Sequence, residues 1–241
     1  MIYGVVLAAG LGERLRPLTL SIPKPLLPTP DGPVMLGSMR KLAEVSSKVY
    51  VVLHYMADLA IPAVKSMGRA LGLDVGIVVH DRLMGTAGHL GFLKGVVGDE
   101  DLVVVANGDI VIDEGFRGLL DSHVSGRWDM TIMTSKLRQP IRFGVLDFSE
   151  SGELIKWREK PTLELSISAG NYVIGGRAIK ELPDSFIDMN DFVNLLLSKG
   201  YRVGGYEARG VKRDVGTMDD YLALLQQGLR AFSDASWRME D

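Results

Sequence analysis

The sequence predicts a doubly wound, Rossmann-like α/β fold built on a mixed, mostly parallel sheet. Apolar runs recur in the first half, at residues 2–7, 49–53, 75–79 and 102–106, and runs that are apolar on both faces are typical of parallel strands covered by helices on each side. Helix-like segments lie between these runs, and such alternation is the pattern of a doubly wound sheet. The chain has 241 residues, 46% of them hydrophobic, which is enough for one large core.

The elements of the first half follow in order. The strand at 2–7 runs directly into a glycine-rich turn, and helices are expected at about 36–45, 57–70, 86–97 and 114–125, where apolar residues recur at helical spacing. The fourth strand, at 102–106, ends in Asn107-Gly108-Asp109. Because ligands of open α/β sheets gather at the carboxyl ends of the strands, the residues that follow each strand are the first candidates for a site.

The second half changes character. Shorter strands, able to pair antiparallel, are expected at 130–135, 144–148, 153–158 and 168–175, with Glu150-Ser151-Gly152 as a hairpin turn. The last helix has a clear start, because Thr217 can cap it and Asp220 lies three residues on. We expect one domain over residues 1–232 and a C-terminal tail over residues 233–241.

Composition limits the partners. A net charge of −3 argues against a sequence-independent nucleic-acid binder, which normally has a basic excess. The sequence has no cysteine, so disulfides and thiol chemistry are excluded, as is usual in a reducing compartment. It shows no signal peptide and no apolar stretch of about 20 residues to span a bilayer. We expect a cytoplasmic protein that binds neither nucleic acid nor membrane, as a monomer or homo-oligomer.

Residues 7–28, LAAGLGERLRPLTLSIPKPLLP, form the most informative segment. Gly10 and Gly12 permit backbone torsions and close approaches that a Cβ would block, and freed backbone N–H groups at such a turn can bind phosphate oxygens. Arg14 offers a planar fork for a pyrophosphate, and Lys24 a compact charge. The segment lacks the Gly-Lys-Ser/Thr ending of a Walker loop, and Leu15 replaces the third glycine of a dinucleotide fingerprint.

This segment resembles the signature of the sugar-1-phosphate nucleotidylyltransferases, Leu-Ala-Gly/Ala-Gly-x-Gly-Thr-Arg-Leu-x-Pro-Leu-Thr followed by Pro-Lys-Pro, with Glu13 in place of the common Thr. The resemblance implies the fold of the nucleotide-diphospho-sugar transferases. It also implies that Arg14, Lys24 and Asp109 are catalytic. The nucleotide contacts that it implies are Leu7, Ala8, Ala9, Gly10, Gly12, Glu13, His80, Gly85 and Thr86.

The same resemblance extends to the second half. Residues 142–161, RFGVLDFSESGELIKWREKP, are similar to the family's sugar segment, which ends in Glu-Lys-Pro, so Gly144, Glu159 and Lys160 are implied sugar-phosphate contacts. Residues 167–175, ISAGNYVIG, resemble Asn-Ala-Gly-Ile-Tyr-Val, and Asn171 is a further implied sugar contact. Asp214, in Lys212-Arg213-Asp214-Val215-Gly216-Thr217, matches the second metal-binding Asp of the family and implies a Mg²⁺ held with Asp109.

The function implied is Mg²⁺-dependent synthesis of an NDP-sugar and pyrophosphate from an NTP and a sugar 1-phosphate. The sequence leaves the base and the sugar open. Two alternatives also stay open. One is a cytidylyltransferase for another phosphorylated small molecule, whose known examples usually lack a match to Glu159 and Lys160. The other is a non-catalytic relative that binds a nucleotide sugar and regulates a partner.

Overall fold

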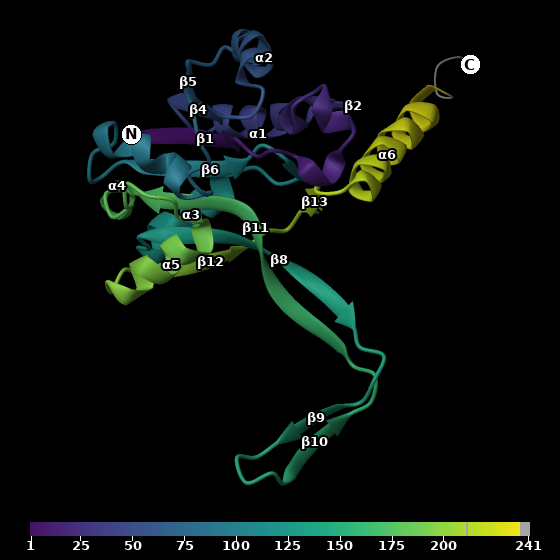
Figure 1. Ribbon diagram of the computed structural model, residues 1–241. Helices are drawn as coiled ribbons and strands as arrows, with labels where there is room; N and C mark the ends of the chain where they lie inside the picture. Colours follow the sequence, from purple (N-terminus) through teal and green to yellow (C-terminus); the bar gives the residue numbers. More distant parts are fainter. Residues whose placement is uncertain (211, 237–241) are drawn as a thin grey trace.

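The computed structural model describes residues 1–210 and 212–236. A seven-stranded sheet forms its centre, in the order β12-β8-β11-β6-β1-β4-β5 (Figure 1). Its strands are β1 (Ile2–Ala8), β4 (Lys48–Leu53), β5 (Val75–Val79), β6 (Leu102–Asn107), β8 (Met130–Pro140), β11 (Thr162–Gly175) and β12 (Val203–Glu207). The pairs β5–β4, β4–β1, β1–β6 and β8–β12 are parallel, whereas β11 is antiparallel to both β6 and β8. The prediction of a mixed, mostly parallel sheet is confirmed.

Helices cover both faces of this sheet, which confirms the doubly wound arrangement. They are α1 (Val34–Ala43), α2 (Ala57–Ala70), the 3-10 helix η4 (Gly88–Gly95), α3 (Arg117–Gly126), α4 (Gly176–Ile179) and α5 (Met189–Ser198). Adjacent strand residues point to opposite faces, so Val6 packs in the core formed with α1, α2 and α3, while Val5 packs in the core formed with η4, α4 and α5. In place of the helix expected at 86–97, the structure has the shorter 3-10 helix η4.

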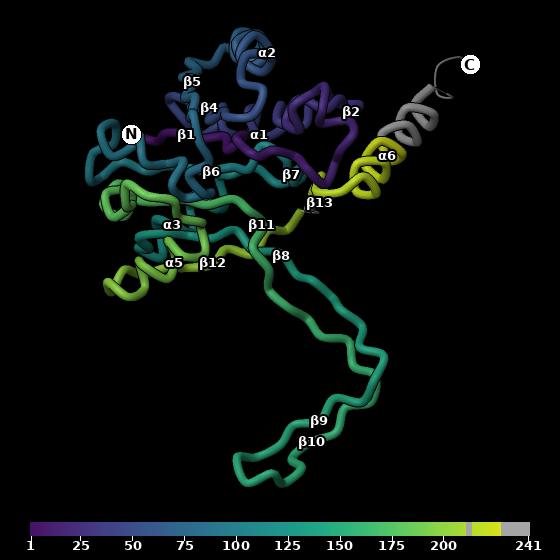
Figure 2. Tube along the Cα trace, viewed as in Figure 1, coloured from purple at the N-terminus to yellow at the C-terminus, as the bar shows by residue number. Residues whose placement is uncertain are grey.

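Short elements connect the N-terminal loop with the C-terminal part of the chain. The loop contains three 3-10 turns, η1 (Glu13–Leu15), η2 (Leu18–Leu20) and η3 (Lys24–Leu26), and the small ladder β2 (Pro28–Thr29) with β3 (Gly32–Pro33). A second small ladder joins β7 (Ile110–Ile112) to β13 (Lys212–Asp214); Figure 2 labels both strands. Leu15, Val215 and Tyr221 share a third buried cluster, which packs the N-terminal loop against the segment that contains Val215 and Tyr221.

The last helix, α6 (Met218–Ser236), begins with the expected cap. The backbone N–H of Asp220 donates to Thr217 Oγ1 at 3.3 Å, and the backbone N–H of Thr217 donates to Asp220 Oδ2 at 2.9 Å. The helix continues past residue 232 to Ser236, and residues 237–241 of the expected tail lie outside the described residues. Within residues 1–210 and 212–236, no helix combines the length and the apolar character needed to cross a membrane.

The second half departs from the sequence prediction in the length of two strands. β8 has 11 residues and β11 has 14, and the two pair from Thr162 opposite Pro140 to Ser168 opposite Thr134. They lead to a hairpin of β9 (Val145–Phe148) and β10 (Leu154–Arg158), turned at Gly152 as expected. We call residues 135–167 the arm; Figure 1 shows it leaving the body. Its outer part is exposed on both faces, so its sequence has little of the core patterning that marks a long strand.

Candidate active site

Two adjoining cavities open at the carboxyl ends of β1 and β6. The first, of about 280 Å³, is lined by Leu7, Ala9, Gly10, Leu83, Gly85, Thr86, His89, Asn107, Asp109, Phe186 and Asp188. The second, of about 500 Å³, is lined by Gly10, Leu11, Gly12, Glu13, Arg14, Lys24, Leu83, Asp109 and Gly216. Gly10, Leu83 and Asp109 line both. The first cavity is mainly apolar with two carboxylates, Asp109 and Asp188, at its wall. The second carries the cationic side chains Arg14 and Lys24, so together the cavities suit a nucleoside and its phosphates.

The glycine loop needs its two glycines for different reasons. Gly12 has φ +66°, and a Cβ there would come within 2.9 Å of Thr19 Cγ2. The Thr19 hydroxyl donates to the Gly12 carbonyl at 2.8 Å, which fixes the turn. A Cβ on Gly10 would meet nothing within 4 Å, although Gly10 lines both cavities. Gly12 therefore shapes the loop, and Gly10 leaves the backbone open to a ligand.

Lys24 is the central cation of the second cavity. Its neighbours Pro23 and Pro25 are buried, and Lys24 itself is only 8% exposed. Its Nζ donates to Asp109 Oδ2 at 2.5 Å. A buried ammonium is costly unless it is paired, and this ion pair offsets that cost. The Asp109 side chain keeps a third of its surface exposed, so the pair lies at the boundary between the core and the cavities.

Asp214 reaches the same place from the far end of the chain. It is paired across the β7–β13 ladder with Ile110, and the backbone N–H of Val215 donates to the Asp109 carbonyl at 3.0 Å. A Cβ built on Gly216 would lie 3.2 Å from Asp214 Oδ1 and 3.6 Å from an Arg14 Nη1 atom. Two carboxylates and two cationic side chains, which the sequence analysis assigned to one site, therefore meet around the second cavity.

The wall of the first cavity is built by two segments that are distant in sequence. Gly85 has φ +77°, and a Cβ there would lie 2.3 Å from the Ile187 carbonyl oxygen, so only glycine allows this close approach. The backbone N–H of Thr86 donates to Asp188 Oδ1 at 3.0 Å, and the Thr86 hydroxyl accepts from the backbone N–H of Met189 at 2.8 Å. These bonds fix the Asp188 carboxylate at the N-terminus of α5, beside the cavity.

Three histidines lie together behind the same wall. His89 lines the cavity, and its Nδ1 lies 3.0 Å from Nδ1 of His80. His54 Nδ1 lies 2.9 Å from the His80 carbonyl oxygen. Burial lowers the pKa of His89 to about 4, with smaller contributions from His80 and His54. His89 is therefore neutral at pH 7 and can present a hydrogen-bonding nitrogen without a charge.

Some of the residues expected to contact nucleotide line a cavity, and others do not. Leu7 and Ala9 line the first cavity, whereas the side chain of Ala8 is buried in the core that includes α1, as strand alternation requires. Glu13 lines the second cavity and forms a 3.4 Å ion pair with Arg16. His80 does not line either cavity and supports His89 instead.

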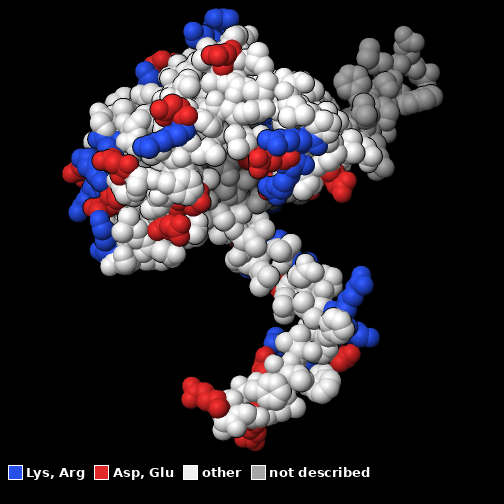
Figure 3. Space-filling model, viewed as in Figure 1, with Lys and Arg blue, Asp and Glu red and all other residues white. Residues whose placement is uncertain are grey.

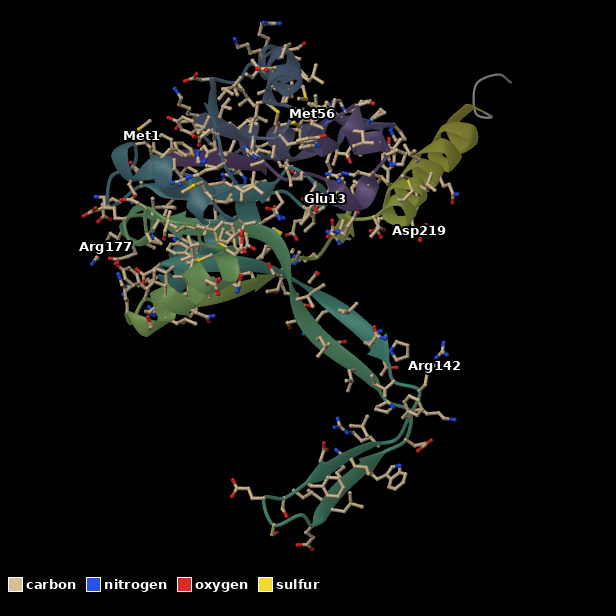
Figure 4. All side chains as sticks on the ribbon, in the orientation of Figure 1. Met1, Glu13, Met56, Arg142, Arg177 and Asp219 are labelled. Carbon is tan, nitrogen blue, oxygen red and sulfur yellow. The ribbon has the colours of Figure 1, made fainter. Side chains whose placement is uncertain are left out.

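Three of the four expected sugar-phosphate residues lie on the arm. Glu159 and Lys160 are exposed and Gly144 is half-buried, at the junction of the β9–β10 hairpin with the longer strands. Figure 4 shows the same separation: Arg142 marks the bend of the arm, while Glu13 marks the glycine loop on the body. Residues 140–161 are all described, and none of them lines either cavity. A single copy in this conformation therefore does not bring the expected sugar residues to the second cavity, which carries Arg14 and Lys24.

Asn171, the fourth expected sugar contact, has its side chain in the core. It is 1% exposed, and its Nδ2 donates to the Ala169 carbonyl at 3.3 Å and approaches Met133 Sδ at 3.6 Å. Asn171 pairs with Ala106 in the β11–β6 ladder and shares the face that packs on α1 to α3. Side chains along β11 point alternately to the two faces of the sheet. The short sequence motif does not tell on which face Asn171 lies, and the structure places it on the buried one.

The cavities also contain residues that sequence reasoning did not assign to the site. They are Leu11, Leu83, His89, Asn107, Phe186, Asp188 and Gly216. Asn107 and Gly216 stand next to assigned motifs and could have been included on that ground. Phe186 and Asp188 lie about 100 residues beyond Thr86, and their place depends on the contact between Gly85 and Ile187. Figure 3 shows acidic and basic side chains mixed over the body and the arm on this face of the molecule.

A family model, sequence relatives and solved structures match most of this chain. The family model described as nucleotidyl transferase matches residues 3–230. A Sulfolobus acidocaldarius protein provisionally named mannose-1-phosphate guanyltransferase is 33% identical over 93% of this chain, and the mannose-1-phosphate guanylyltransferase of Mycobacterium tuberculosis is 31% identical over 90%. The chain covers 62% of the length of each. Among solved structures, a Bacillus anthracis protein provisionally named glucose-1-phosphate thymidylyltransferase, in complex with a sucrose, has a TM-score of 0.75 at 23% identity, over 95% of both chains.

Proposed function

The chain belongs to the nucleotidyl transferase family, and from this premise we propose that it makes an NDP-sugar and pyrophosphate from an NTP and a sugar 1-phosphate. The observation that carries the proposal is the Lys24–Asp109 ion pair at the junction of the two cavities, with Asp214 and Arg14 beside it. The fold and the family are those expected from the sequence.

The chemistry requires charge neutralisation more than proton transfer. An oxygen of the sugar phosphate attacks the α-phosphorus of the NTP in line, and the bond from that phosphorus to the pyrophosphate oxygen breaks, with its electron pair leaving on pyrophosphate. The attacking oxygen is already ionised at neutral pH, so no general base is needed. Catalysis then depends on position and on preorganised positive charge. Lys24 would stabilise charge at the α-phosphorus, and Arg14 would bind the departing pyrophosphate.

Asp109 and Asp214 fit a magnesium ion that arrives with the nucleotide. Mg²⁺ in phosphate-transfer sites is usually held by one or two carboxylates together with substrate phosphates and water. Across residues 1–210 and 212–236, no group of three or more His, Cys, Asp or Glu side chains is placed to hold a metal, which suits an ion that needs the substrate to complete its ligands. When bound, the ion would supply positive charge to the nucleotide phosphates.

For the base, we propose guanine, and for the sugar phosphate, mannose 1-phosphate. Two relatives at 31–33% identity carry names that specify these substrates. Independently, the Asp188 carboxylate lies in the wall of the nucleoside cavity, and a carboxylate can accept from N1–H and the N2 amino group of guanine together. Uracil and thymine offer a single ring N–H, so they would leave part of this carboxylate unmatched.

The test is an assay for pyrophosphate release with each NTP and a set of sugar 1-phosphates, followed by identification of the NDP-sugar. Asp188→Asn should lower kcat/KM for GTP by about tenfold to a hundredfold, since a lost partner for a buried donor costs about 1–3 kcal/mol. Asp191→Asn is the matched control, because Asp191 lies in the first turn of the same helix and does not line the cavity. Equal losses with all NTPs would exclude Asp188 as the base reader, and no turnover with any pair would exclude the proposed reaction.

A further inference from the structure

The hairpin at the end of the arm has one apolar face without a covering layer. In the β9–β10 register, Leu146 lies opposite Trp157 and Phe148 lies opposite Leu154, so these four side chains share one face. Their exposed fractions are 39%, 62%, 57% and 48% respectively. We call these four residues the hairpin face. An isolated two-stranded hairpin is marginally stable in water, and large exposed apolar patches generally mark an interaction surface.

The other face of the same hairpin carries charged side chains. Arg158 Nη2 donates to Asp147 Oδ1 and Oδ2 at 3.0 and 3.1 Å, and Lys156 lies opposite Asp147 in the ladder. The hairpin is therefore amphipathic across its two faces. Only the apolar face would gain from being covered by a partner.

The hairpin face is physically linked to the expected sugar-phosphate residues. Trp157 Nε1 donates to Glu159 Oε2 at 3.1 Å, and a Cβ on Gly144 would lie 2.9 Å from the same Nε1 atom. Lys160 follows directly, with φ +43°. Whatever surface receives the hairpin face therefore receives Glu159 and Lys160 together with it.

The arm is braced in an extended form. Its two strands pair continuously from Thr162–Pro140 to Ser168–Thr134, and the backbone N–H of Ile141 donates to the Pro161 carbonyl at 2.9 Å where the ladder meets the hairpin. Ion pairs cross this ladder to Glu164, from Lys136 at 3.5 Å and from Arg138 at 3.3 Å. The ladder holds the hairpin away from the cavities of its own copy, whereas a second molecule can meet the hairpin without any change in the ladder.

A receiving surface exists at the cavities. Leu83 and Phe186 line the nucleoside cavity and are 42% and 61% exposed, so its rim is apolar as well as open. The same cavities contain the phosphate-binding cations but none of the expected sugar residues of the arm. Rim and hairpin face thus complement each other in both polarity and function.

We propose that two copies of this chain exchange arms. The hairpin face of each copy covers the cavity rim of the other and delivers Glu159 and Lys160 to the other copy's phosphate cavity. Such an exchange closes with two-fold symmetry, since each copy gives one arm and receives one. The sugar-binding role of Lys160 rests on the proposed function, but the association itself does not.

The first experiment measures oligomeric state by light scattering after size exclusion, without any substrate. The wild-type chain should be a dimer. Phe148→Thr with Leu154→Thr replaces two opposed apolar side chains of the hairpin face by threonine, a residue suited to strands. This double substitution should raise the dimer dissociation constant by at least about a hundredfold. The matched control, Asp147→Thr with Lys156→Thr, changes the opposed pair on the polar face and should remain dimeric. Circular dichroism and melting curves check that each variant is folded.

The second experiment asks in which copy the arm acts. Chains carrying Lys24→Ala and Lys160→Ala are co-expressed with different affinity tags, and the heterodimer is isolated through both tags. Activity is measured at a sugar-phosphate concentration below the wild-type KM, where the raised KM of Lys160→Ala makes that homodimer nearly inactive and Lys24→Ala is inactive through kcat. With exchanged arms, one of the two sites of the heterodimer has both lysines, so it should show about half of the wild-type activity. If the arm served its own copy, neither site would have both lysines.

The outcomes are decisive. A monomeric wild-type chain, a dimer that the hairpin-face variant leaves intact, or a heterodimer as inactive as the two homodimers would each overturn the exchange. If the wild-type chain makes no NDP-sugar, the proposed function fails, and the substrate-free measurement of oligomeric state still decides whether the hairpin face holds two copies together.

Discussion

Replacing Lys24 by methionine removes one charge from the site while it preserves the length of a buried side chain. The wild-type ammonium lies 2.5 Å from Asp109 Oδ2, and the residue is 8% exposed. The stem also packs near the glycine loop, since a Cβ on Gly12 would lie 3.1 Å from Lys24 Cβ. Methionine fills the same space, whereas alanine would also open a void.

The expected loss is mainly catalytic. Removal of one preorganised donor from a developing oxyanion costs about 2.7–4 kcal/mol, or about 10²–10³ in kcat. The binding of NTP should change less, because Arg14 and the loop backbone remain. The half-saturating Mg²⁺ concentration should fall, because the Lys24 ammonium pairs with the Asp109 carboxylate in the wild-type chain and no longer competes for it in the variant.

The expected effect on folding is small by comparison. Breaking a fully buried pair costs about 3–5 kcal/mol, but a third of the Asp109 side chain is exposed, so water can solvate the carboxylate that is left. We expect a loss of about 1–2 kcal/mol, which is roughly 2–8 °C in Tm for a chain of this size.

The assay is steady-state pyrophosphate release at saturating NTP and sugar phosphate, with a melting curve for the same samples. Lys65→Met, an exposed position on α2, is the matched control and should leave both quantities unchanged. A Lys24→Met enzyme that keeps more than about a tenth of the wild-type kcat would refute the role given to this lysine, as would a loss of activity that only follows a large fall in Tm.

Three further predictions concern other parts of the site. Asp109→Asn and Asp214→Asn should each remove most activity, and the double variant should be scarcely worse, because groups that act as a unit are not additive; losses that multiply in the double-mutant cycle would count against a shared metal ion. Lys160→Ala should raise KM for the sugar phosphate with little effect on KM for NTP, and equal changes in both constants would contradict its assignment. His89 is neutral in the folded state because its pKa is lowered to about 4 from about 6.5 in the unfolded chain. Its contribution to stability is therefore intact above pH 6.5 and is lost as the pH falls toward 4, up to roughly 3 kcal/mol. Unfolding by urea at several pH values should show a flatter profile for His89→Gln, and an unchanged profile would exclude His89 as the source.

The phosphate loop and the parallel strands could be predicted because their signals are local. The strand at 2–7, the turn at Gly10 and Gly12, and the residues after the strand at 102–106 each occupy a short stretch whose pattern has few structural solutions. Asp214 was assigned through the family motif, and the β7–β13 ladder then places it beside Asp109. The arm strands were predicted too short, because a strand exposed on both faces has no buried side chain to give it a period.

The sequence by itself determined the fold class, the family and the cationic groups that we propose bind phosphate, since these depend on backbone torsions and on charges held in one contiguous loop. Tertiary structure alone decided which side chains line the first cavity and where the expected sugar-phosphate residues lie. Asp188 reaches the nucleoside cavity only through the contact of Gly85 with Ile187, and Asn171 is buried because the β11–β6 register turns it toward the core. Both depend on how separate segments pack. The energy of that packing comes from contacts between residues far apart in the chain, which no short motif records.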